Sequence, residues 1–108
     1  MTEELNNTCT DLKELFMQQD FEKMEEILGG LSREAVREMA MNQQGIIAKY
    51  YAQEKLDMIF SHLNFVAFAS FLYEYAGKTG AFSEEEYTDG FRVFTDIYAM
   101  LQQLKQEQ

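Results

Sequence analysis

The chain opens with apolar residues at helical spacing. They recur three or four positions apart, at Leu5, Cys9, Leu12, Leu15 and Phe16. This spacing predicts an amphipathic helix over residues 2–18. Asp20 then predicts the start of a short second helix, because a carboxylate there can accept hydrogen bonds from the free amides of the first turn. Gly29-Gly30 is expected to end that helix, since glycine readily adopts the left-handed conformation of a helix stop.

Ser32 predicts the start of a third helix, because its hydroxyl can accept a hydrogen bond from an unpaired amide of a first turn. Leu31 and Val36 have the spacing of a hydrophobic staple across that start. The apolar stripe that follows is interrupted by the polar residues 42–45, which end in a glycine. Glycine within a helix costs about 1 kcal/mol relative to alanine, so we expect a bend or a break there. The sequence leaves open whether residues 33–76 form one bent helix or two.

Residues 56–76 are apolar on nearly every side of a helix. Such a helix belongs in the middle of a bundle or at an oligomer interface. Alternate residues from 65 to 75 are also apolar, as in a strand, but a run of this length without a turn signal favours the helix. The segment holds more large side chains than a small bundle is expected to bury. We therefore predict an exposed apolar interface made by Phe65, Phe68, Leu72 and Tyr73.

The last helix has the most complete set of local signals. Ser83 and Glu86 have the spacing of a capping box, and Phe82 and Tyr87 have that of the matching hydrophobic staple. Apolar residues then repeat every three or four positions as far as Leu104. Together the segments predict an all-α fold, a compact bundle of four to five helices with short connections. A length of 108 residues suits one core, so residues 1–108 are expected to form a single helical domain.

Charge is concentrated at the two ends of the chain. Nineteen acidic against nine basic residues give a net charge of −10. Residues 1–31 hold eight acids and two bases, and residues 83–108 hold six and two, whereas the apolar middle is neutral. We therefore expect a neutral central helix wrapped by helices with acidic outer faces. So negative a surface argues against direct binding of nucleic acid, which needs a basic face.

Residues that often carry chemistry are few in this chain. The single cysteine, Cys9, lies on an apolar stripe with no base tied to it, so we interpret it as a packing residue. The single histidine, His62, has no acidic residue three or four positions away to complete a helical metal site, so we expect a core or interface histidine. No two carboxylates stand in the unlike environments that acid–base catalysis needs. The sequence therefore predicts a protein that is not an enzyme and binds neither a cofactor nor a metal.

Residues 75–86 resemble the calcium-binding loop of an EF-hand. Gly80, Phe82 and Glu86 stand at its turn, apolar and twelfth positions. However, tyrosine, glycine and threonine occupy its first, third and fifth positions, where carboxylate or amide ligands are required. We therefore interpret the segment as a helix–loop–helix joint with a capping box.

The sequence gives an expectation about location as well. One cysteine cannot form an internal disulfide, so an oxidising compartment is not implied. The first residues lack the positive charge and apolar stretch of a secretory signal. The longest run without charge, residues 58–73, is shorter than the roughly 20 residues of a membrane-spanning helix. We therefore expect a cytoplasmic protein without a membrane partner.

Two functions from different classes fit these patterns. The first is a small acidic protein–protein interaction module, an adaptor or regulator that binds another protein or a second copy of itself as a homodimer. The alternative is an acidic mimic of nucleic acid that inhibits a basic DNA- or RNA-binding enzyme, as an anti-defence protein of a phage or mobile element would. The carboxylates predicted to form that acidic interface are Glu22, Glu25, Glu26, Glu84, Glu85 and Asp89.

Overall fold

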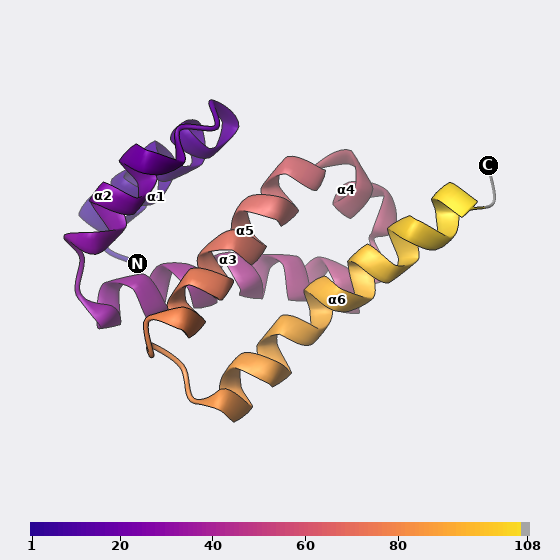
Figure 1. The fold of residues 1–108 in the computed structure, drawn as a ribbon. Helices are drawn as coiled ribbons and strands as arrows, with labels where there is room; N and C mark the ends of the chain where they lie inside the picture. The colour runs from indigo at the N-terminus through magenta and orange to yellow at the C-terminus, as the bar shows by residue number, and fades with distance from the viewer. Residues whose placement is uncertain (107–108) are drawn as a thin grey trace.

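The computed structural model describes residues 1–106, which form six helices joined by short connections. The helices are α1 (Glu3–Met17), α2 (Phe21–Gly29), α3 (Arg33–Ala52), α4 (Leu56–Ser61), α5 (Leu63–Lys78) and α6 (Glu84–Gln106) (Figure 1). No β-strand occurs within these residues. The predicted all-α bundle is therefore confirmed, with one helix more than the sequence led us to expect.

The middle of the chain forms three helices. α3 runs without interruption through residues 42–45, so no break occurs there. The polar side chains of this stretch are used in packing, since Gln44 Nε2 donates to the carbonyl of Gly90 in α6 at 3.0 Å. The chain instead leaves the helix at the end of α3, where Glu54 has a φ of 58°, and the helix breaks again at His62. The single central helix expected from the sequence is therefore two, α4 and α5.

The helix starts agree with the capping residues identified in the sequence. The side chains of Asp20 and Ser32 each accept a hydrogen bond from an amide in the first turn of α2 and α3, at 3.4 and 3.1 Å. α2 ends at its glycine pair as expected, but Gly30 has a φ of −86°, so the expected left-handed stop is wrong. The Gly30 amide closes the turn by donating to the Ile27 carbonyl at 3.1 Å, in a conformation that does not require glycine.

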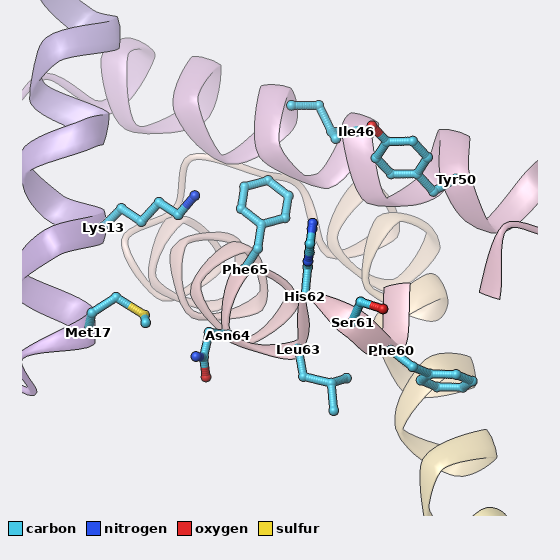
Figure 2. Close-up of a pocket in the computed structure, with 10 residues that line it drawn as sticks. All are labelled: Lys13, Met17, Ile46, Tyr50, Phe60, Ser61, His62, Leu63, Asn64 and Phe65. Carbon is cyan, nitrogen blue, oxygen red and sulfur yellow. The ribbon is translucent and has the colours of Figure 1, made fainter. Parts of the chain in front are cut away.

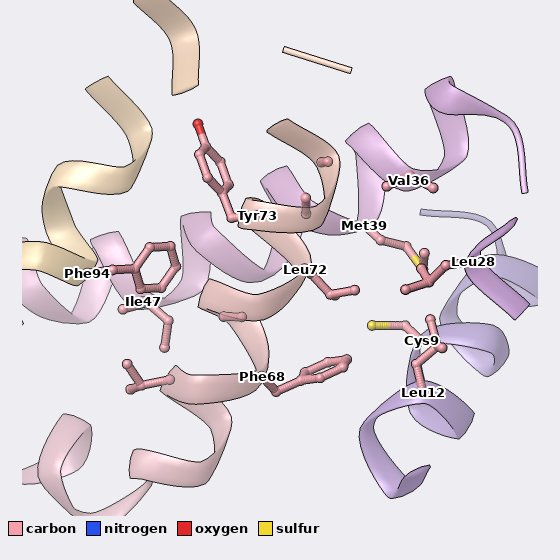
Figure 3. Packing of buried hydrophobic residues seen from close by; sticks show 14 of the residues in the cluster. Cys9, Leu12, Leu28, Val36, Met39, Ile47, Phe68, Leu72, Tyr73 and Phe94 are labelled. Carbon is pink, nitrogen blue, oxygen red and sulfur yellow. The ribbon is translucent and has the colours of Figure 1, made fainter. Parts of the chain in front are cut away.

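The helix α5 lies in the middle of the bundle and packs against α1, α3, α4 and α6 (Figure 1). Side chains from all six helices form one buried hydrophobic cluster. Figure 3 labels members of this cluster from α1, α2, α3, α5 and α6. Its largest fully buried members are Phe68, Phe94, Leu12, Met24, Leu28, Met39, Ile47, Ile59, Leu72, Ile97 and Val66. The expectation of an apolar central helix wrapped by amphipathic neighbours is confirmed.

The start of α6 is held by the predicted capping box and by an arginine of α3. The Ser83 amide donates to Glu86 Oε1, and the Glu86 amide donates to Ser83 Oγ, both at 3.1 Å. Arg37 approaches the same carboxylate from α3, with its Nη2 2.6 Å from Oε2, and its Nη1 donates to the Ala81 carbonyl at 3.0 Å. Glu86 therefore links α3 to the α5–α6 connection, and its carboxylate is already engaged at the position where an EF-hand would use it as a ligand.

Replacing Glu86 by glutamine is expected to weaken the acid dependence of stability. Hydrogen bonds from Arg37 and the Ser83 amide lower the pKa of the Glu86 carboxyl from 4.5 to about 2. Because this pKa is lower in the folded than in the unfolded state, the carboxylate stabilises the fold above pH 4.5, and this contribution is lost as the pH falls towards 2.

Urea unfolding of the wild type and of Glu86→Gln, compared between pH 6 and pH 2, measures this contribution. The free energies of unfolding of the two proteins should converge as the pH falls. A gap that stayed constant over this range would contradict the ion pair with Arg37. Glu85→Gln is the control for the loss of one exposed charge at the neighbouring position.

Candidate functional site

An open groove lies where the end of α1, the second half of α3 and the junction between α4 and α5 meet (Figure 2). Its volume is about 650 Å³, within the range of natural binding sites. It is lined by Lys13, Met17, Ile46, Tyr50, Phe60, Ser61, His62, Leu63, Asn64 and Phe65. None of these ten side chains is buried, so the groove is a surface feature and not an internal cavity.

The wall of the groove is largely apolar. Phe65 and His62 point from the start of α5 towards α3, and Lys13 reaches across from α1 (Figure 2). The Lys13 ammonium lies 4.8 Å from the centre of the Phe65 ring, within reach of a cation–π interaction. On either side, Ile46 is 38% exposed and Met17 is 53% exposed. Large apolar side chains are therefore left in contact with water at this groove.

A second groove, of about 430 Å³, continues along α3 and shares Ile46 and Tyr50 with the first. It adds Lys49, Gln53 and Lys55 to the lining, and the Lys55 ammonium lies 5.9 Å from the centre of the Tyr50 ring. No aspartate or glutamate lines either groove. In a chain with a net charge of −10, this is a locally basic and apolar surface. We call the two grooves together the lysine groove.

His62 is exposed and lines the lysine groove, so of the two positions expected for it, core or interface, the core is excluded. It ends α4 and precedes α5, with φ −126° and ψ 46°. Its backbone carbonyl accepts hydrogen bonds from the amides of Phe65 and Val66, at 3.0 and 3.1 Å. The helix break places the imidazole in the groove, whereas an unbroken apolar helix was the reason to expect burial. A role of His62 at an interface stays a prediction.

Most of the predicted apolar interface is buried inside the protein. Phe68 and Leu72 are fully buried and Tyr73 is nearly so, and the prediction of exposure is wrong for these three residues. The reason is that α1 covers one side of α5, where the rings of Phe16 and Phe68 lie 5.7 Å apart, while α3 and α6 cover other sides. Of the four predicted residues only Phe65 is partly exposed, and it lines the lysine groove.

The six carboxylates of the predicted acidic interface are all exposed, in two separate groups. The first group lies on one face of α2 and comprises Glu22, Glu25 and Glu26. The second lies in the first two turns of α6 and comprises Glu84, Glu85 and Asp89. α2 packs on α1 whereas α6 packs on α5 and α3, and the two groups stand apart on different sides of the molecule (Figure 1). None of the six forms an ion pair within residues 1–106.

The chain matches no protein-family model, no curated protein and no solved structure. What the lysine groove can do therefore follows from its own side chains. Phe65 and Ile46 offer apolar contact, Asn64 offers hydrogen bonds, and Lys13 offers positive charge. These are the interactions of non-covalent binding.

Within residues 1–106, no group of three or more histidine, cysteine or acidic side chains is placed to hold a metal ion. None of the described helices combines the length and the apolar character needed to cross a bilayer. In the groove, the hydroxyl of Ser61 donates to the Asp57 carbonyl at 2.6 Å, which directs its proton away from the neighbouring His62.

The buried thiol of Cys9 is expected to react slowly with alkylating agents in the folded protein. Its side chain is 6% exposed, which confirms its interpretation as a packing residue, and burial raises the pKa of the thiol. Both effects lower the amount of accessible thiolate, which is the reactive form. Labelling by iodoacetamide, followed by mass spectrometry, should be many times slower in native buffer than in denaturing guanidinium chloride. Equal rates in the two buffers would contradict the burial of Cys9.

Proposed function

We propose that this protein is a non-enzymatic interaction module, an adaptor or regulator that binds another protein through the lysine groove. The observation that carries the proposal is the exposure of the large apolar side chains of Met17 and Ile46 along a groove of about 650 Å³. Exposed apolar surface rimmed by polar residues is typical of interaction sites. Covering it contributes about 25 cal/mol per Å² before the costs of association.

A binding role also agrees with the groups that line the groove. Nucleophilic or acid–base catalysis needs a base that is held by a third group. His62 is the only histidine of the lining, and no carboxylate lines the groove to orient it. The lysines supply charge for recognition, and the aromatic residues supply contact area.

The test compares two variants on one helix. Ile46→Glu places a charge in the groove, whereas Met41→Glu makes the same kind of change at a residue of α3 that is 47% exposed and lines neither groove. Each protein is immobilised and used to capture partners from a lysate of the source cells. We expect wild type and Met41→Glu to retain the same proteins and Ile46→Glu to lose them. Retention by Ile46→Glu, or capture of nothing by the wild type, would contradict the proposal.

An acidic mimic of nucleic acid is the second candidate, because six carboxylates on α2 and α6 are exposed and unpaired within residues 1–106. A basic DNA- or RNA-binding enzyme would meet one of the two groups. Replacing Glu22, Glu25 and Glu26 together by glutamine tests the α2 group. Mimicry predicts a basic partner that is lost in this variant and at raised salt, and that Ile46→Glu retains. A partner that the triple variant also retains would exclude the α2 group.

A further inference from the structure

The lysine groove places three lysines around an apolar wall in a protein with a net charge of −10. From this juxtaposition we propose that its occupant is an amphipathic helix of another protein, with carboxylates on both flanks of its apolar face. The inference rests on the proposed function and names the chemistry of the partner.

The charges of the groove favour an acidic occupant. Lys13 and Lys55 stand over aromatic rings of the groove, with ammonium-to-ring distances of 4.8 and 5.9 Å. Neither they nor Lys49 forms an ion pair within residues 1–106. Carboxylates of an occupant would therefore meet uncompensated ammonium groups. The net negative charge repels an acidic partner at long range, but salt screens this repulsion beyond about 8 Å at physiological ionic strength, so the charges at contact decide.

The openness of the groove favours a macromolecular segment over a small molecule. Sites for small ligands bury roughly 70–90% of the ligand surface. Here none of the ten side chains that line the larger groove is itself buried. An occupant can cover this surface only from above, while the rest of its own surface contacts its parent protein or water.

The shape of the groove favours a helix over an extended peptide. Residues 1–106 contain no strand whose edge could accept an extended segment. The walls are helices, and along α3 the lysine groove runs from Ile46 to Gln53. At 1.5 Å per residue this is about 10 Å, or two turns of an occupant helix. Such a helix would present apolar residues at positions i, i+3 or i+4, and i+7.

A second copy of this chain does not supply such a face from its described helices. α1 and α2 are acidic, but each leaves only one large apolar side chain exposed, Met17 and Phe21, whereas the occupant needs three along one face. α3 exposes Met41 and Ile46, which are five positions apart, and α4 exposes Met58 alone. α6 leaves Leu104 exposed near its end, but the adjacent Lys105 would repel the lysines of the groove. The occupant is therefore expected to come from a different protein.

A displayed library of helical peptides tests the inference directly. Each peptide is roughly 14 residues long, about four turns, with apolar residues fixed at i, i+3 and i+7 and with Glu, Lys, Gln or Ala at the other positions. Peptides are selected on the wild-type protein, and those that also bind Ile46→Glu are removed. We expect the remaining peptides to favour glutamate over lysine beside the apolar face. A selected peptide should bind Lys13→Glu/Lys49→Glu about tenfold more weakly than wild type and bind Lys105→Glu unchanged.

The outcomes separate this inference from the proposed function. Groove-dependent peptides without a preference for glutamate would overturn the inference and leave the proposed function standing. If no selected peptide depended on Ile46, the groove would fail as a docking site and both would be contradicted. Sedimentation of the protein alone tests whether the occupant is a second copy of this chain. A dimer that Ile46→Glu abolishes and Met41→Glu keeps would overturn the inference in favour of that second copy.

Discussion

Replacing Phe94 by alanine is expected to lower the free energy of unfolding by about 3–5 kcal/mol. Phe94 is fully buried in α6, and its ring centre lies 5.5 Å from that of Phe91 and 6.1 Å from that of Tyr73. The substitution loses the transfer of the ring from water and leaves a cavity that its neighbours fill only in part. Because the total stability of a domain is about 5–15 kcal/mol, the variant loses a large fraction of it.

Urea unfolding followed by circular dichroism measures this loss. Leu104→Ala is the matched control, because it shortens an apolar side chain of the same helix that is 45% exposed. Its effect is expected to stay within about 0.5 kcal/mol. If Phe94→Ala unfolded at the same urea concentration as the wild type, α6 would not be docked on α5 as the structure has it.

The helix starts are the features that the sequence predicts best, because each depends on residues three positions apart. Asp20, Ser32 and Ser83 all accept a hydrogen bond from the amide three residues later. Such a bond depends on residue type and spacing, and both can be read from the chain. The same holds for the return bond from the Ser83 amide to Glu86, which completes the capping box.

The breaks and the burial of α5 depend on contacts between distant segments. Glu54 and His62 stand where the chain leaves a helix, yet neither is a proline or glycine that would mark a stop. The break at His62 separates α4 from α5, and α4 packs on α3. Phe68 is buried because Phe16, far earlier in the chain, packs against it. The local sequence pattern around Phe68 does not predict this contact. The prediction of exposure was wrong for Phe68 for this reason.

The lysine groove could not be predicted from the sequence, because its residues come from three segments that lie far apart in the chain. Lys13, Ile46 and His62 meet only in the folded chain. One signal was present, since Ile46 and Ile47 are consecutive and point about 100° apart around the helix axis, so an apolar stripe centred on Ile47 leaves Ile46 at its edge. The structure buries Ile47 and leaves Ile46 exposed.

The helical glycines Gly45 and Gly90 are expected to respond in opposite directions to substitution by alanine. Gly45→Ala should stabilise by up to about 1 kcal/mol, because alanine favours the helix and no heavy atom of the surroundings lies within 4 Å of the added methyl group. Gly90→Ala should destabilise by about 1–3 kcal/mol, because a methyl group there would overlap the Tyr73 hydroxyl and lie 2.5 Å from its Cζ. Tyr73 is held in place, since its hydroxyl donates to the Glu86 carbonyl at 3.0 Å and its ring stacks 4.5 Å from that of Phe82.

Urea unfolding of the two variants, and of Gly90→Ala combined with Tyr73→Phe, tests this close approach. Removal of the hydroxyl relieves the nearest contact, so Gly90→Ala should cost less in the Tyr73→Phe background than in the wild type. Stabilisation of the protein by both alanines would contradict the close approach, because helix propensity alone favours alanine at either site. Gln44 of α3 also donates to the Gly90 carbonyl. Gly90 is therefore the point where α3, α5 and α6 meet, and a residue without a Cβ lets them pack this closely.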